Sequence, residues 1–84
     1  MRTVSIEMPD TAFAALRKSP DDFAREMRIA AAVKWYELGE LSQGKAAEIA
    51  GLTRAEFINA LARFRVSPLQ YTAAEMEREL NGAD

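Results

Sequence analysis

Hydrophobic and polar residues alternate with a period of two at the start of the chain, over residues 3–8. Val4, Ile6 and Met8 are the apolar positions, and the alternation stops at Pro9. This period is typical of a strand with one buried face. Because a lone strand cannot satisfy its own backbone and no similar second strand follows, we expect it to pair with the same strand of a second subunit.

A short helix is predicted over residues 10–16. Asp10 is a suitable N-cap, and Phe13 and Leu16 are spaced to form an inner face. A longer helix is predicted to begin after Ser19, because a serine cap, a proline and two aspartates are favourable at a helix start.

The longer helix is expected to end near Leu38, before Gly39. It carries two apolar stripes at helical spacing: Phe23, Met27, Ala30 and Ala31 in one, and Ile29, Val33 and Tyr36 in the other. A helix with two apolar faces contacts neighbours on more than one side. An intersubunit core and a central place in a monomeric bundle both agree with this pattern.

Residues 43–62 have the pattern of a helix-turn-helix, QGKAAEIAGLTRAEFINALA. Ala47 is small enough for the two helices to cross, and Gly51 lies four residues later, where a left-handed backbone suits glycine. The first helix is expected to begin at Ser42 or Gln43 and to extend through residue 50. The second is expected to be capped by Thr53 and to extend to about residue 64.

The second helix of this unit is the one expected to enter the major groove of DNA. Arginine commonly recognises guanine and asparagine recognises adenine, while threonine and lysine side chains reach phosphates. The candidate DNA-binding residues are Gln43, Lys45, Thr53, Arg54, Asn59 and Arg63. Residues 42–65 contain four basic and two acidic residues, whereas the chain as a whole has a net charge of −2. This positive balance is weak, so a purely structural helical hairpin is the alternative interpretation.

The strand and two helices of residues 1–41 also allow a second DNA surface, a ribbon-helix-helix. Thr3, Ser5 and Glu7 would then face outward beside Arg2. Because Glu7 would repel phosphates, the segment is interpreted as a dimerisation ribbon more readily than as a DNA-reading element.

Residues 66–84 form an acidic tail with a short amphipathic stretch at residues 73–80. Such a segment suits docking into a groove of another protein, and a helix packed on its own domain is the equal alternative. The candidate partner-binding residues are Leu69, Tyr71, Met76, Arg78 and Leu80.

Composition narrows the function further. The 84 residues are 49% apolar and 29% charged and include neither histidine nor cysteine. Histidine bases, triads ordered by histidine and ordinary zinc sites are therefore impossible. Carboxylates, lysines and hydroxyls remain as chemical groups, but a chain this small offers little room for a cleft that excludes water, so we expect no enzyme activity, cofactor or metal. Because a lone core of this size is marginal, a homodimer is expected. No stretch reaches the roughly 18 apolar residues of a membrane span, and we expect a soluble cytoplasmic protein.

Several segments together resemble uncharacterised protein family 0175. They are Met8-Pro9, Ser19-Pro20-Asp21 and, most specifically, residues 39–57 with Gly44-Lys45-Ala46-Ala47-Glu48 and Ala50-Gly51-Leu52. The resemblance implies an antitoxin of a type II toxin–antitoxin pair, encoded beside a PIN-domain ribonuclease toxin. Such a protein would silence the toxin and repress its own operon. Arg78 is the one basic residue after Arg65, so it is the candidate to enter the acidic active site of such a toxin.

The sequence thus predicts a mainly α-helical dimer. Its expected parts are a strand–helix–helix segment for dimerisation (1–41), a helix-turn-helix (42–65) and a docking tail (66–84). The leading function is an antitoxin and autorepressor that performs no chemical reaction. The alternatives are a stand-alone transcription regulator and an interaction module that does not bind DNA.

Overall fold

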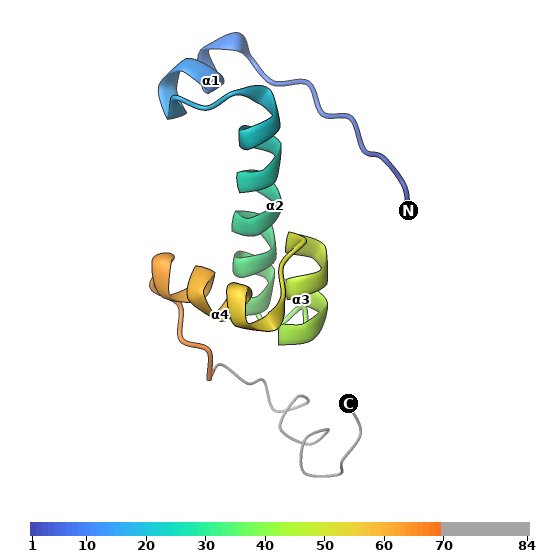
Figure 1. The fold of residues 1–84 in the computed structure, drawn as a ribbon, viewed down its shortest axis with the longest axis vertical. Coiled ribbons are helices and arrows are strands. Elements are labelled where there is room, and N and C mark those ends of the chain that lie inside the picture. The colour runs from blue at the N-terminus through green and yellow to red at the C-terminus, as the bar shows by residue number, and fades with distance from the viewer. Residues whose placement is uncertain (70–84) are drawn as a thin grey trace.

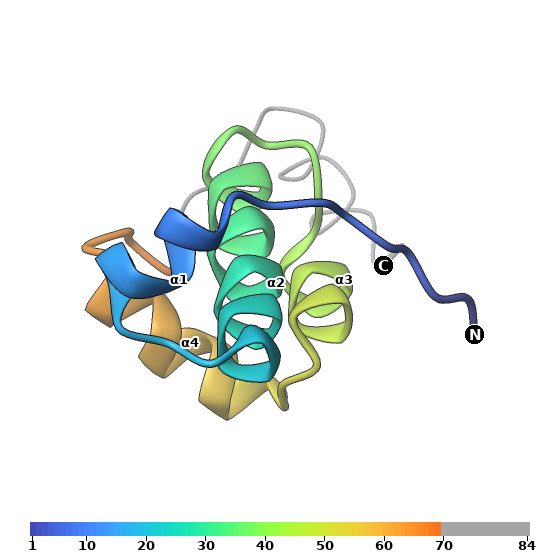
Figure 2. The same cartoon turned by 90° about the horizontal axis from the view of Figure 1, so that it is seen from above.

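The computed structural model describes residues 1–69 and has four α-helices in that range (Figure 1). They are α1 (Asp10–Leu16), α2 (Pro20–Glu37), α3 (Gln43–Ala50) and α4 (Arg54–Arg63). The helices α3 and α4 lie against the C-terminal half of α2, and α1 lies near its other end (Figures 1 and 2). Helices are thus present at the four positions predicted within residues 10–64. The helix predicted over residues 73–80 lies outside the described residues.

Local signals explain both ends of α2. The Ser19 hydroxyl accepts a hydrogen bond from the backbone N–H of Asp22 at 3.2 Å, and Pro20 takes the first helical position. At the other end Leu38 is the C-cap, and Gly39 follows with a φ of 80°. Few other residues tolerate this left-handed conformation, so the glycine ends the helix where the sequence predicted.

The hydrophobic core joins α2 to α3 and α4. Phe57 and Leu61 on α4 are completely buried, and the Phe57 ring meets that of Tyr36 edge to face, with centroids 5.9 Å apart. The alanines of α3 permit a close approach to α2 because they have no long side chain to separate the backbones. The buried cluster consists of Ile29, Ala32, Val33, Tyr36, Ala46, Ala47, Ala50, Phe57, Ala60, Leu61 and Val66.

The predicted N-terminal strand is wrong. Residues 1–9 have no secondary structure, and the described residues 1–69 contain no strand. Val4 is 79% exposed and Ile6 is 60% exposed, so these two side chains pack on no core, while Met8 is half-buried. The physical reason is that a strand needs a neighbouring backbone to receive its hydrogen bonds, and the described chain supplies none.

The details of α1 also differ from the prediction. Pro9, not Asp10, is the N-cap, and no side chain caps the helix. Asp10 is instead the first helical residue, where its negative charge still suits the helix dipole. Phe13 packs edge to face on Phe23 at 4.9 Å, but Leu16 is exposed rather than internal. The short helix α1 therefore contacts α2 mainly through one aromatic ring.

The side of α2 opposite the core is incompletely covered. Met27 and Ala31 are half-buried, while Trp35 and Leu38 are exposed. Their spacing of three or four residues places them on one side of the helix. We call these four residues the outer face of α2. It contains Met27 and Ala31 of the first apolar stripe expected from the sequence and continues to Leu38, the C-cap of the helix.

Candidate nucleic-acid interface

The turn between α3 and α4 is fixed by Gly51 and by an arginine from α2. Gly51 has a φ of 74°, and the N–H of Leu52 donates to the carbonyl of Ala47 at 2.9 Å. The Nε of Arg28 donates to the carbonyl of Ile49 at 2.9 Å. A Cβ on Gly51 would lie 3.3 Å from the Arg28 guanidinium. The cation thus lies at the negative end of the α3 dipole and against the turn.

Arg28 was not among the residues singled out from the sequence. It belongs to neither apolar stripe of α2, and its partner Ile49 lies 21 positions away. The signals that could have found it are a basic residue at the middle of α2 and the end of α3, whose carbonyl groups need a hydrogen-bond donor. Neither signal links the two without the tertiary structure.

The starts of α3 and α4 are both capped by hydroxyl groups. Ser42 accepts from the N–H of Lys45 at 3.1 Å. At the start of α4, Thr53 accepts from the N–H of Glu56 at 3.1 Å, and the Glu56 carboxylate accepts from the N–H of Thr53 at 2.8 Å. This reciprocal capping box lowers the pKa of Glu56, because the backbone N–H of Thr53 and then its hydroxyl stabilise the carboxylate.

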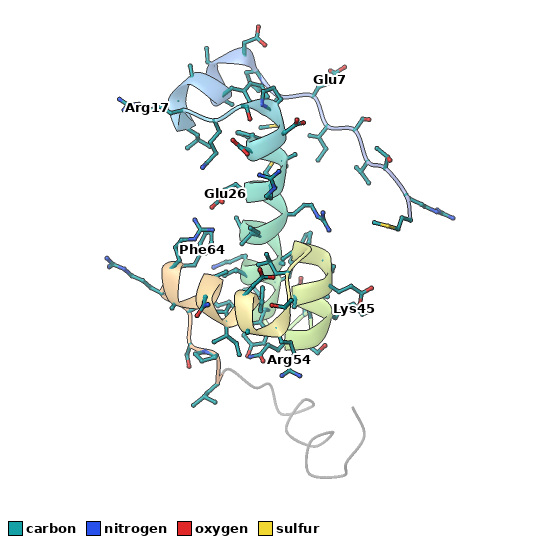
Figure 3. The ribbon with its side chains drawn as sticks, viewed as in Figure 1. Glu7, Arg17, Glu26, Lys45, Arg54 and Phe64 are labelled. Carbon is teal, nitrogen blue, oxygen red and sulfur yellow. The ribbon has the colours of Figure 1, made fainter. Side chains whose placement is uncertain are left out.

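Of the six candidate DNA-binding residues, Gln43 and Arg54 are in direct contact in the structure, and the others lie at separate places on α3 and α4. All are on the surface except Gln43, which is half-buried. Gln43 and Lys45 lie in the first turn of α3, Thr53 and Arg54 lie at the start of α4, and Asn59 and Arg63 lie further along α4. Figure 3 places Arg54 where α3 and α4 begin and Lys45 on the side of α3 away from α4.

Arg54 and Gln43 form a hydrogen-bonded pair between the two helices. The Nε and a terminal nitrogen of Arg54 donate to Oε1 of Gln43 at 3.2 and 2.7 Å. The amide nitrogen of Gln43 in turn donates to the carbonyl of Pro68 at 3.2 Å and to the Tyr36 hydroxyl at 3.4 Å. The Tyr36 hydroxyl donates to the same Pro68 carbonyl at 2.7 Å. Gln43 therefore links the start of α4 to α2 and to the segment after α4.

Arg63 forms an ion pair with Glu26 of α2. Two guanidinium nitrogens donate to the two carboxylate oxygens at 2.7 and 3.3 Å, and the guanidinium carbon lies 4.7 Å from the centre of the Phe64 ring. This hydrogen bond, together with the positive charges of Arg63 and Lys18, lowers the pKa of Glu26 despite its partial burial. Arg63 thus holds α4 to α2, which the sequence pattern did not indicate.

The remaining candidate DNA-binding residues include Lys45, which forms an ion pair, and Asn59, which is exposed. Lys45 is paired with Glu48 at 3.0 Å, and both side chains are largely exposed. Asn59 is exposed on the outer side of α4. Arg65, just beyond α4, is also exposed and adopts a φ of 60°. Positive side chains therefore lie at both ends of α4, with Arg54 at its start and Arg63 and Arg65 at its end. Asn59 lies between the two ends.

The candidate partner-binding residues fall mostly beyond the described part of the chain. Leu69 is exposed at the end of the described residues, directly after the turn held by Tyr36 and Gln43. Tyr71, Met76, Arg78 and Leu80 lie outside the described residues.

Two features of metal-binding and membrane proteins are absent from the described residues. Among residues 1–69 no group of three or more acidic, histidine or cysteine side chains is arranged to hold a metal ion. Within the same range, no helix has the length and apolar character needed to cross a membrane.

Taken together, these features define a small helical protein in which a helix-turn-helix arrangement, α3–α4, packs across a longer helix. The family model of an uncharacterised protein family, UPF0175, matches residues 1–84. The chain therefore belongs to the family UPF0175, as its sequence motifs indicated.

Two relatives carry the same family name. A UPF0175 protein of Aeropyrum pernix is 37% identical over 82 residues, which cover 98% of this chain and 86% of the relative. A UPF0175 protein of Archaeoglobus fulgidus is 39% identical over 56 residues, which cover 67% of this chain and 63% of the relative. No solved structure gives a significant match.

Proposed function

We propose that this protein is the antitoxin of a type II toxin–antitoxin pair, which represses its own operon and neutralises a PIN-type ribonuclease toxin. The observation that carries the DNA-binding half is α4, a capped helix that is exposed along one side and has cationic groups at both ends. Such a helix, preceded by a tight turn and a shorter helix, has the shape that enters the major groove in helix-turn-helix proteins.

Each candidate residue has a role in this proposal. Lys45 exchanges its exposed partner Glu48 for a DNA phosphate, which costs little because an exposed ion pair contributes at most about 1 kcal/mol. Arg54 and Thr53 contact phosphates at the start of α4, and Asn59 contacts a base. Gln43 orients Arg54, to which it is hydrogen-bonded at 2.7 Å. Arg63 keeps α4 in place through Glu26.

A homodimer forms part of the proposal. One helix-turn-helix contacts only a short DNA segment, and two copies related by a two-fold axis would read a repeated half-site. The outer face of α2 favours contact with a second protein chain, because the large apolar side chains of Trp35 and Leu38 are exposed on it. We assign this face to the second subunit.

The toxin-binding half rests on the family resemblance and on the charge of the tail. In this proposal Leu69 begins the docking segment, and Tyr71, Met76 and Leu80 fill an apolar groove of the toxin. Arg78 lies among the acidic metal ligands of the ribonuclease and excludes metal or RNA. Arg78→Glu would then abolish neutralisation, whereas Arg78→Lys would retain part of it. Purification with the product of the adjacent gene distinguishes this function from a stand-alone regulator.

The DNA-binding half is tested by titrating the full chain with duplex DNA from upstream of its own gene. We expect Asn59→Ala and Arg54→Ala to weaken binding, and Arg54→Ala to reduce the salt dependence by about one phosphate contact. Arg25→Ala is the matched control, because Arg25 is also exposed but lies in the N-terminal half of α2, in an ion pair with Asp22. Equal binding by all three variants would contradict the proposal.

A further inference from the structure

The exposed side of α4 carries no charged group along its middle. Ala55, Ile58, Asn59 and Ala62 are all exposed, and Ile58 is 39% exposed although it is a large apolar side chain. Their spacing of three, four and seven residues places them together, opposite the buried Phe57, Ala60 and Leu61. We call Ala55, Ile58, Asn59 and Ala62 the outer face of α4. Figures 1 and 2 show no other described helix on the side of α4 that faces away from α2.

The arginines that flank this face are turned away from it or held at its edges. Arg54 donates two hydrogen bonds to Gln43 on α3, and Arg63 donates two to Glu26 on α2. An arginine that reads guanine must present the same fork to the base edge. Because these two forks are already bonded within the protein, guanine recognition is disfavoured at the centre of α4.

An uncharged centre with cations at both ends matches the charge pattern of a DNA groove. Base edges in the groove carry no net charge, and the phosphates lie along its two walls. A ten-residue helix is about 15 Å long, and the major groove is about 12 Å wide. Arg54 and Arg65, at opposite ends of α4, are therefore spaced to reach phosphates on both walls.

The chemistry of the outer face of α4 fits one kind of base pair. Thymine has a methyl group in the major groove that prefers apolar contacts, and adenine offers the donor and acceptor that an asparagine amide binds through two hydrogen bonds. We propose that the outer face of α4 recognises A·T base pairs, with Asn59 bonded to adenine and Ile58, Ala55 and Ala62 against thymine methyl groups. This inference rests on the proposed DNA-binding function and specifies its target.

The inference is tested by selecting duplexes from a random pool with the full 84-residue chain. A·T pairs are expected at the central positions of each selected half-site. Thymines at those positions are then replaced by deoxyuridine, which removes only the methyl group. Each lost contact should weaken binding about fourfold, because burying one methyl group contributes about that factor. In Ile58→Ala the same replacement should have a smaller effect.

Ile6→Ala is the matched control, since Ile6 is an exposed isoleucine away from α4. It should bind both duplexes as the unaltered protein does. Replacing the central adenines by 7-deazaadenine should weaken the unaltered protein but not Asn59→Ala.

The outcomes separate the inference from the function on which it rests. Selected sites with G·C at their centres, or equal binding of thymine and deoxyuridine duplexes, would overturn the A·T inference and leave DNA binding intact. Failure to select any duplex would overturn both. If Ile58→Ala left DNA binding unchanged but prevented dimerisation or capture of the neighbouring gene product, the outer face of α4 would be a protein interface and the inference would fail.

Discussion

Residues 1–18 and residues 29–66 use their apolar side chains in opposite ways. In the first region Val4 and Ile6 lie largely in solvent, and no residue of α1 is buried. In the second region one continuous cluster joins α2, α3, α4 and Val66, with Phe57 and Leu61 completely buried. We call the second region the helical core.

The two regions differ in burial because they differ in how many of their backbone N–H and C=O groups can form hydrogen bonds within the region itself. A helix makes its hydrogen bonds within one segment, and the helical core adds hydroxyl caps at Ser42 and Thr53 and a glycine at residue 51. Residues 1–9 have a strand pattern whose hydrogen bonds require another backbone. An apolar pattern therefore leads to burial only where the local backbone is already satisfied and a complementary face is within reach.

The largest expected effect distinguishes the two regions by side-chain truncation. Phe57→Ala should lower the free energy of unfolding by about 3–5 kcal/mol, because it empties a completely buried site between α2 and α4. Ile6→Ala should change it by less than about 0.5 kcal/mol. Urea titrations followed by circular dichroism measure both. A large loss in Ile6→Ala would indicate that residues 1–9 are buried in the protein in solution.

Glycine substitutions test the turn of the helical core. Gly51→Ala should cost about 1–2 kcal/mol, since its φ of 74° is unfavourable for other residues and its Cβ would meet Arg28 at 3.3 Å. Gly44→Ala is the control, because Gly44 lies in the first turn of α3 and a Cβ there would have open space around it. It should stabilise the protein by about 0.5–1 kcal/mol. Thermal unfolding of the two variants measures both effects. If Gly51→Ala and Gly44→Ala changed the unfolding temperature in the same direction, this account of the turn would be contradicted.

Threonine substitutions compare a capped helix with an uncapped one. Thr53→Ala removes the hydroxyl that accepts from Glu56 at the start of α4, and should cost about 1 kcal/mol. Thr11→Ala, in α1, removes an exposed hydroxyl and should change stability by less than about 0.5 kcal/mol. Denaturant midpoints of the two variants give the comparison, and equal midpoints would mean that the capping box contributes nothing.

The smallest effect concerns the ion pair that joins α4 to α2. Because the folded protein lowers the pKa of Glu26, the pair stabilises the fold fully above the ordinary glutamate pKa, near 4.5. That contribution is lost as the pH falls through the lowered pKa. At neutral pH Glu26→Gln should therefore cost at most about 1 kcal/mol, since the pair is partly exposed. The difference between the two proteins should shrink in acid, and a difference independent of pH would contradict this role.

Sequence reasoning succeeded where a local rule was sufficient. Ser19 with Pro20, Gly39, Gly51 and Thr53 each mark a helix boundary that the structure contains. It failed at residues 3–8, where the period-two pattern was clear but the strand depended on a partner backbone. It also missed Arg28 and the pairing of Arg63 with Glu26, whose partners lie 21 and 37 positions away. Such contacts depend on how helices pack and leave no trace in residue spacing.

The amino-acid sequence by itself determined the four described helices, the caps and ends of α2, α3 and α4, and the family, because capping groups, glycine turns and apolar spacing act over a few residues. Only the tertiary structure decided which surface residues are engaged. It turned Arg54 toward Gln43 and Arg63 toward Glu26, and it left Ile58 and Asn59 exposed between them. The physical reason is that a side chain's partner is set by the crossing of whole helices, which bring together residues that are far apart along the chain.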